Sequence, residues 1–266
     1  MSFKFRFFSF VFSLALVPGS SNAHELMVFA SRHSLPESGG ESTIYLCNGH
    51  RFPVDELLEA EAIERYDMVS PAEATSTLQR KGLSIHANVV DFKQAGVYTV
   101  VASRKPSIWT YLTDAQGERH ITRGSKIDHE GKKMDTSTRY SMFAKTLVVV
   151  GKPCEAAPKP VGMTVEIIPL DGPAKWLANK DIRFQVLENG KPVPSVDVVA
   201  RNVGFKPDNA WNYATETSEK GEFSIRPNCP GTWIVGIEFK KPSPDEARRE
   251  YDFASFATTL TFEVLP

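Results

Sequence analysis

Apolar and polar residues alternate in short stretches along most of the chain, and Gly, Pro, Asn and Asp separate the stretches. Such alternation is typical of half-buried β-strands joined by turns. Helical periodicity is limited to Asp55–Tyr66 and Asp245–Arg249. Many short strands with regular turns indicate an all-β protein built from β-sandwiches. The predicted strands are Ser42–Cys47, Leu83–Val90, Gly96–Ser103, Ala144–Val150, Met163–Pro169, Asp181–Glu188, Asp197–Arg201, Glu222–Arg226, Thr232–Phe239 and Ala257–Val264.

A proline-rich stretch divides this strand pattern into two halves. Residues 152–160 hold three prolines and show no apolar periodicity, so we expect a stiff linker there. The pattern therefore predicts two β-sandwich domains in tandem, over residues 24–151 and 161–266. Inside the first half, residues 104–138 are polar and rich in charge, which predicts a long loop.

The N-terminus has the pattern of a secretory signal peptide. Lys4 and Arg6 precede an apolar run over Phe7–Val17, and small residues lead up to Ala23. This order predicts export, with cleavage after Ala23 and removal of residues 1–23. The apolar run is too short for an ordinary membrane span, so we expect no stable membrane insertion after cleavage.

The charge balance and the motifs of the sequence limit the classes of function that we expect. The 266 residues include 31 Lys and Arg against 32 Asp and Glu, a net charge of -1, which argues against a nucleic-acid partner. The sequence carries no nucleophile elbow, zinc-protease helix motif or phosphate-binding glycine loop, so we expect no enzyme.

The sequence positions of the three cysteines predict different environments for them. Cys154 and Cys229 both occupy loop-like positions, and an oxidising compartment would allow them to form a disulfide. We predict that the two cysteines form this disulfide, and two free thiols are the alternative. Cys47 falls in a predicted strand and is expected to be a small buried apolar residue.

Cleavage after Ala23 would make His24 the first residue of the mature chain. Its α-amine and imidazole could then chelate one metal ion, because near neutral pH the imidazole is mostly unprotonated and the α-amine gives up its proton to the metal at modest cost. Nitrogen ligands suit nickel, cobalt, copper and zinc. An accidental N-terminal histidine remains the alternative.

Other histidines could complete a metal site. His50 follows a predicted strand and is the next candidate, although it could equally be an ordinary turn residue. His33, or one of His120 and His129 in the predicted polar loop, would supply the remaining ligand. Solvated loop histidines are the alternative for the last two.

The C-terminal half resembles small sandwiches of the transthyretin and carboxypeptidase-regulatory type, in its strand–turn–strand order from Phe184 to Val198 and in its later turns at Glu219-Lys220-Gly221 and Pro230-Gly231. The whole mature chain resembles a bacterial exported family, formerly of unknown function, that is linked to nickel or cobalt uptake as a periplasmic component. The stretches that carry this resemblance are Ala23-His24-Glu25-Leu26, Gly49-His50-Arg51-Phe52-Pro53, Arg139–Leu147, Gly162–Pro169 and Asp252–Phe262. Met27 departs from the family, which commonly has an aromatic residue at that position.

The resemblance implies a periplasmic protein that binds nickel or cobalt as cargo and hands the ion to a membrane permease. Copper or zinc would suit the same nitrogen ligands. A cell-envelope interaction module without metal is the second hypothesis. The third is a copper-dependent oxidative enzyme that uses an N-terminal histidine.

Overall fold

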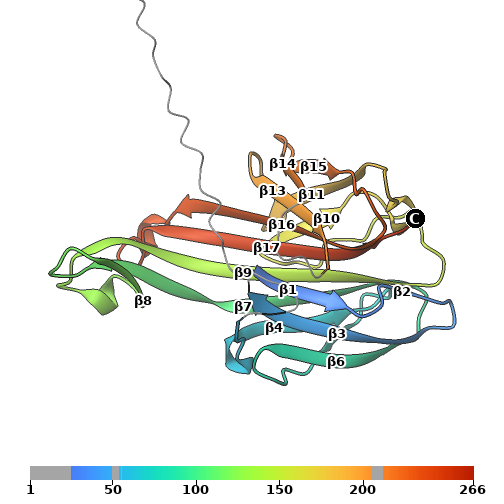
Figure 1. Cartoon of the computed structure of the whole chain (residues 1–266), viewed down its shortest axis with the longest axis horizontal. Coiled ribbons are helices and arrows are strands. Elements are labelled where there is room, and N and C mark those ends of the chain that lie inside the picture. The colour runs from blue at the N-terminus through green and yellow to red at the C-terminus, as the bar shows by residue number, and fades with distance from the viewer. Residues whose placement is uncertain (1–24, 50–53, 55, 205–211) are drawn as a thin grey trace, which may run out of the picture.

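The computed structural model describes residues 25–49, 54, 56–204 and 212–266 (Figure 1). Their regular structure is all β, apart from four single turns of 3-10 helix, so the predicted fold class is confirmed. No helix in this part of the chain is long and apolar enough to cross a membrane. The predicted signal peptide at 1–23 lies outside the described residues.

Seventeen strands follow one another along the described residues, with short turns and loops between them. The first half contains β1 (Glu25–Ala30), β2 (Ser34–Leu35), β3 (Gly40–Gly49), β4 (Ile63–Val69), β5 (Thr75–Thr77), β6 (Ile85–Phe92), β7 (Gly96–Thr113), β8 (Arg119–Arg123) and β9 (Met134–Val150). The second half contains β10 (Val165–Pro169), β11 (Ile182–Glu188), β12 (Lys191–Pro192), β13 (Asp197–Asn202), β14 (Tyr213–Glu216), β15 (Glu222–Ile225), β16 (Gly231–Pro242) and β17 (Phe253–Val264). The 3-10 turns are η1 (Ala60–Ala62), η2 (Ile127–His129), η3 (Pro173–Lys175) and η4 (Asp245–Ala247).

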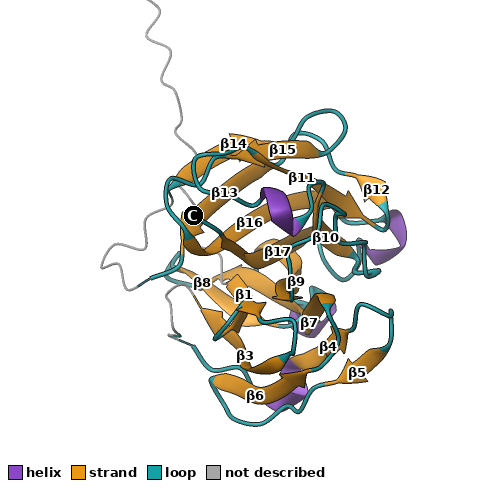
Figure 2. Cartoon of the chain, turned by 90° about the vertical axis from the view of Figure 1, so that its right-hand side faces the viewer, coloured by secondary structure: helices purple, strands orange, loops and turns teal. Residues whose placement is uncertain are grey.

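The strands form three sheets. The largest has ten strands in the order β14-β13-β16-β17-β9-β7-β4-β5, with β2 added on β9 and β8 on β7. A sheet of order β1-β3-β6 belongs to the first half, and β10, β11, β12 and β15 form the third sheet. Figure 2 shows the first half below and the second half above, with β9 and β17 between them.

The strand β9 contributes to two hydrophobic cores. Ala144 and Val148 pack into the core of the first sandwich, which the β1-β3-β6 sheet covers. Phe143 and Leu147 pack into the core of the second sandwich together with Trp233. Successive side chains of a strand point to opposite faces of its sheet, so one strand can serve both cores.

The two halves are also joined by strand pairing. The strands β9 and β17 pair in parallel from Phe253 with Thr138 to Thr261 with Thr146. Residues 152–160, the predicted linker, form no helix or strand, but the sandwiches that they connect share one continuous sheet.

A buried ion pair links β9 to β10 inside the second sandwich. The Lys145 Nζ lies 2.7 Å from Oε1 of Glu166, and the two side chains are 3% and 2% exposed. The Val161 backbone N–H also donates to this carboxylate, at 3.0 Å. Burial lowers the pKa of Lys145, and the neighbouring Glu166 carboxylate acts against that lowering. Each charge therefore needs the other to remain in the core.

We expect the Lys145→Met substitution to destabilise the fold by about 3–5 kcal/mol, because it leaves the Glu166 carboxylate buried without its cation. The double variant Lys145→Met, Glu166→Gln should recover much of this loss, since no charge then stays buried. Urea unfolding of both variants measures the difference. Equal destabilisation of the single and double variants would contradict the role of the uncompensated charge.

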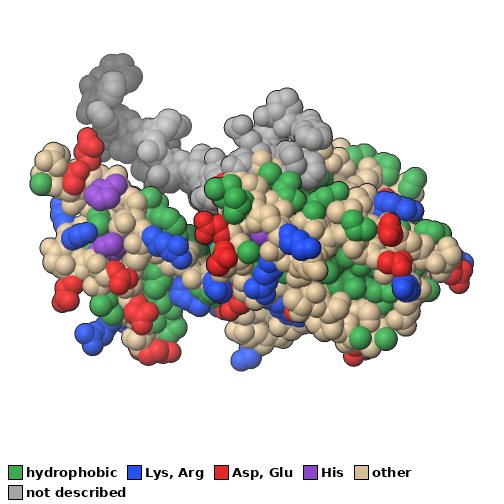
Figure 3. Space-filling model, turned by 90° about the horizontal axis from the view of Figure 1, so that it is seen from below, with side chains coloured by type: hydrophobic (Ala, Val, Ile, Leu, Met, Phe, Trp, Pro, Cys, Tyr) green, Lys and Arg blue, Asp and Glu red, His purple; other side chains and the backbone are tan. Residues whose placement is uncertain are grey.

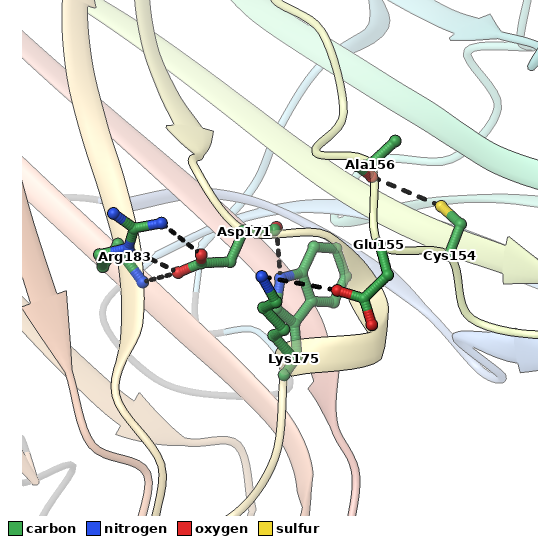
Figure 4. A network of polar contacts seen from close by, with 7 residues as sticks. Cys154, Glu155, Ala156, Asp171, Lys175 and Arg183 are labelled. Carbon is green, nitrogen blue, oxygen red and sulfur yellow. Dashed lines mark hydrogen bonds and ion pairs between the residues drawn. The ribbon is translucent and has the colours of Figure 1, made fainter.

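The connecting segment docks tightly onto η3 (Figure 4). The Ala174 backbone N–H donates to the Cys154 carbonyl at 3.0 Å, and Glu155 pairs with Lys175 at 3.5 Å. A Cβ added at Gly172 would lie 2.3 Å from the backbone carbonyl carbon of Glu155. Only glycine therefore permits this close approach of two backbones.

The Gly172→Ala substitution should lower the stability of the protein by roughly 1–3 kcal/mol, because the added methyl group forces the connecting segment away from η3. The Gly204→Ala substitution is the matched control, since a Cβ there meets no atom of the described residues within 4 Å. Thermal unfolding of the two variants compares them directly. A melting temperature for Gly172→Ala as high as that of the control would count against tight docking.

The predicted disulfide between Cys154 and Cys229 is wrong, because all three cysteines of the chain are free. The Cys154 thiol donates to the Ala156 carbonyl in the connecting segment, at 3.4 Å (Figure 4). Cys229 instead packs against the core of the second sandwich. Cys47 is buried, as predicted.

The predicted loop at 104–138 is also corrected by the structure. Strand β7 continues into this region as far as Thr113, β9 begins in it at Met134, and β8 pairs with β7 between them. Together with the ends of β16 and β17 they form an arm that extends beyond both sandwiches (Figure 1). Polar residues on a sheet outside the cores produced the loop-like pattern.

The predicted helix at Asp55–Tyr66 is wrong in its described part, which contains η1 and the start of β4. Ile63 and Tyr66 are both buried although they lie three residues apart. The pairing of β4 with β7 shifts register between Ile63 and Arg65. A β-bulge thus gives this strand an apolar spacing that resembles a helix.

Candidate functional site

The predicted metal ligands are spread over separate elements. His24 and His50, the two principal candidates, lie outside the described residues. His33 follows β1 and is buried, with its Nδ1 2.9 Å from the Leu147 carbonyl oxygen. The carbonyl can only accept, so Nδ1 carries the proton of this hydrogen bond.

The two candidates from the predicted loop lie on the arm. His120 belongs to β8 and is exposed. His129 belongs to η2 and is buried, with its Nε2 3.2 Å from the Arg123 carbonyl oxygen. Within the described residues, no group of three or more His, Cys, Asp or Glu side chains could hold a metal ion. The structure therefore does not bring His33, His120 and His129 into one site.

His33 lines a small cavity between the two sandwiches. Ser34, Trp176 and Glu263 also line it, and the Ser34 hydroxyl donates to the Glu263 carboxylate. The cavity measures about 10 Å³, which is close to the smallest space that one water molecule needs. The His33 Nε2 is buried and has no hydrogen-bond partner among the described residues.

Burial lowers the pKa of His33, and the hydrogen bond to Leu147 and the Glu263 carboxylate oppose that lowering. The folded protein therefore holds a neutral imidazole at this position at neutral pH. Because Nδ1 carries the proton, Nε2 keeps a lone pair, which can accept a hydrogen bond only from a water molecule or another donor.

The lowered pKa of His33 predicts a pH dependence of stability. Below the unfolded pKa of about 6.5 the unfolded chain binds a proton that the folded chain resists, so stability falls as the pH decreases. The His33→Gln substitution should flatten the fall between about pH 7 and pH 5. Urea unfolding across this range measures it.

His120→Gln is the matched control for that experiment, because it removes an exposed imidazole from β8. A pH profile that changes equally in the two variants would refute the assignment to His33.

The start of β1 and the end of β3 form a second polar region. The backbone pairing of the two strands ends with Glu25 opposite Gly49. Threonine hydroxyls of β17 meet the carbonyls of β1, with Thr259 Oγ1 donating to Leu26 at 2.6 Å. The N-terminal strand is therefore held by both its own sheet and the shared sheet.

A salt bridge from the second sandwich reaches this region. Arg201 Nη2 of β13 lies 3.1 Å from Oε2 of Glu25, with the two side chains only 7% and 17% exposed. Charge-assisted hydrogen bonds of buried groups are among the stronger polar contacts in proteins. The first described residue of β1 is thus fixed to a strand of the other half of the molecule.

Another polar contact lies at this end of β3, on the opposite face of the sheet from Glu25, because Asn48 pairs with Leu26. Asn48 is fully buried and its Nδ2 donates to Oε2 of Glu56 at 2.6 Å. The Asn48 Oδ1 is buried and lacks a hydrogen-bond partner within the described part of the chain. Sequence reasoning missed Glu25, Asn48, Glu56 and Arg201, because only the strand register brings the start of β1 to the end of β3.

The family described as "Domain of unknown function (DUF4198)" matches residues 21–241 of the chain. No curated protein matches it. Two solved structures are similar at 12% identity. The D0-D1 domain of Intimin covers 92% of this chain and 100% of its own, with a TM-score of 0.22. The D00-D0 domain of Intimin covers 89% and 98%, with a TM-score of 0.20.

Proposed function

The chain belongs to this family of unknown function, and we propose that it is an exported periplasmic protein that binds nickel or cobalt and passes the ion to a membrane permease. The metal is cargo and not a catalytic cofactor, and the protein performs no reaction of its own. The second half of the molecule serves as a transthyretin-like sandwich that supports the metal-binding end. Copper or zinc would suit the same nitrogen ligands.

The strand register at the N-terminal end carries this proposal. Glu25 and Gly49 are paired, and His24 and His50 are the residues that come next in the sequence on either side of this pair. Paired residues of neighbouring strands lie about 5 Å apart, so the pairing of Glu25 with Gly49 supports the proposal that His24 and His50 bind the same ion. The register was not visible in the sequence and supports the pairing of these two candidates.

The anchoring of β1 supports the proposal as well. A metal site gains affinity when its ligands are held in place before the ion arrives. The Arg201–Glu25 salt bridge fixes the residue that follows His24, and the threonine hydroxyls of β17 bond to the carbonyls of Leu26 and Val28 further along β1. The mature N-terminus would then supply its α-amine and imidazole nitrogens from a rigid strand.

Metal titration of the processed protein tests the proposal. Protein that starts at His24 should bind Ni²⁺ or Co²⁺ tightly in isothermal titration calorimetry, and His24→Ala should abolish tight binding. One extra residue before His24 should weaken binding by at least about tenfold, because it removes the α-amine from the chelate while it keeps every imidazole. The His50→Ala variant should also lose affinity.

Two controls sharpen the titration. His120→Ala removes an exposed histidine of the arm and should leave the affinity unchanged. Arg201→Met removes the salt bridge to Glu25 and should weaken binding while all histidines stay in place. Equal affinity of the processed and extended forms would disprove the N-terminal chelate. A lack of metal binding by both forms would favour the cell-envelope interaction module.

A further inference from the structure

The first sandwich has an edge strand that pairs on one side only. Strand β6 is the last strand of the sheet β1-β3-β6, and among the described residues it pairs with β3 alone. Figure 1 shows it along the lower side of the molecule. The edge at β1 is covered, because threonine hydroxyls of β17 donate to the carbonyls of Leu26 and Val28. Strand β6 has no such cover from the part of the chain that the structure describes.

The hydrogen-bond pattern shows which residues of β6 face this edge. The Ser31 backbone N–H donates to the Thr43 carbonyl, so the odd-numbered residues of β3 bond toward β1. In a strand between two neighbours, residues that bond to one neighbour alternate with residues that bond to the other. The even-numbered residues of β3 therefore bond to β6, where their partners are also even-numbered. The odd-numbered residues of β6, from Ile85 to Asp91, direct their backbone N–H and C=O groups away from β3.

Three of these residues have both backbone groups unpaired within the described residues, namely Ala87, Val89 and Asp91. At Ile85 the preceding bend comes close, because a Cβ added at Gly82 would lie 2.4 Å from the Ile85 carbonyl oxygen. On the inner face, the Gln79 backbone exchanges two hydrogen bonds with the side-chain amide of Asn88, a contact that does not use the backbone of β6. The free edge therefore runs from Ala87 to the end of β6.

The odd-numbered residues also carry exposed apolar side chains. Of the six large hydrophobic side chains that are exposed among the described residues, four belong to β6 or to the segments beside its start, namely Leu57, Leu83, Ile85 and Val89. Over β1 the same face of the sheet is covered, because Met27 and Phe29 pack against Ile234 of β16. The outer face of this sheet is therefore apolar and exposed along β6.

This edge lacks the features that protect edge strands. Natural proteins place lysine, proline or a β-bulge on an open edge, or keep the edge strand very short. Strand β6 has eight residues without Lys, Arg or Pro, and its pairing with β3 has no bulge. Its one acidic residue, Asp91, pairs with Lys93 at 3.4 Å. An unprotected edge with apolar side chains can accept a further strand, whose backbone bonds to the free N–H and C=O groups.

The charges around this edge do not favour a partner with a large charge of one sign. Figure 3, in which the first sandwich is turned toward the viewer, shows hydrophobic side chains among acidic and basic ones, without a patch of one sign. Electrostatic attraction of a strongly charged partner would need such a patch. A second copy of this chain, with its net charge of -1, meets little repulsion here.

We propose that two copies of the protein pair through β6, antiparallel about a two-fold axis at Asn88. This axis sets Ala87 of one copy opposite Val89 of the other, so the two residues exchange backbone hydrogen bonds and a small side chain lies beside a larger one. The same pair recurs on the other side of the axis, as in any two-fold interface. A second copy thus satisfies two open edges at once, whereas a foreign peptide would satisfy one.

The interface is small, so the dimer forms reversibly. Contacts limited to one strand of each copy bury less than the roughly 1,200–2,000 Å² of a stable complex, which is typical of transient association. The proposal does not depend on metal binding. All measurements are therefore made with a chelator present, which prevents metal ions from bridging two chains.

Sedimentation velocity of the full mature protein tests the proposal. The average sedimentation coefficient should rise toward that of a dimer between about 10 and 500 μM protein. Val89→Lys brings a cation into the pairing and should weaken dimerisation by at least about tenfold. Ala87→Pro removes an N–H that faces the free edge and should weaken dimerisation as well.

Ile121→Lys is the matched control, because it adds the same charge at an exposed side chain of another strand, β8. It should sediment as the unsubstituted protein does, and circular dichroism reports whether each variant folds. Amide hydrogen exchange gives a second readout, since the N–H groups of Ala87 and Val89 should exchange more slowly at high protein concentration.

Two results would overturn the proposal. One is a protein that stays monomeric over the whole concentration range, which would favour a strand of another protein as the occupant of this edge. The other is association that Val89→Lys and Ile121→Lys reduce to the same extent, or that leaves the exchange of Ala87 and Val89 unchanged, because the contact between copies would then lie elsewhere.

Discussion

The contribution of β9 to two hydrophobic cores is the constraint on which the rest of the structure depends. Its side chains alternate between two cores, with Ala144 and Val148 on one side and Phe143 and Leu147 on the other. A register slip of one residue would exchange the two sets and place Lys145 in the wrong core. The parallel pairing with β17 and the ion pair with Glu166 both oppose such a slip. The two halves therefore form their cores on a common strand and not independently.

The sheet that both sandwiches share changes the interpretation of the connecting segment, residues 152–160. Three prolines predicted a stiff spacer between separate domains, and the segment is indeed without strands. Its role is different, because the sheet already joins the two sandwiches and the segment only connects β9 of that sheet to β10 of the third sheet. The close packing of Gly172 against Glu155 holds it there. Relative motion of the two halves would require breaking the pairing of β9 with β17.

The local alternation of apolar and polar residues was sufficient to predict a strand where one side of that strand packs into a core. The alternation in Glu222–Ile225 predicts β15, because its apolar residues Phe223 and Ile225 face one core while the others face solvent. The same logic fails for the arm, where both faces carry polar residues and the strand signal disappears. It also fails for β4, whose bulge changes the spacing of Ile63 and Tyr66.

The candidate sites depend still more on contacts between distant residues. A histidine in a polar stretch gives no sign of burial, yet His33 is enclosed by Leu147 and Trp176, which lie more than a hundred residues away. The Glu25–Arg201 salt bridge joins residues 176 positions apart. The arm needs the pairing of five strands, β7, β8, β9, β16 and β17, before it can be recognised as a sheet.

The N-terminal strand and the arm occupy different parts of the shared sheet. Strand β1 is held to β17 by Thr259 and to β13 by Arg201. The arm is formed where β9 and β17 continue past both cores. Because β9 and β17 run through both regions, the pairing of these two strands sets the position of the N-terminal strand relative to the arm.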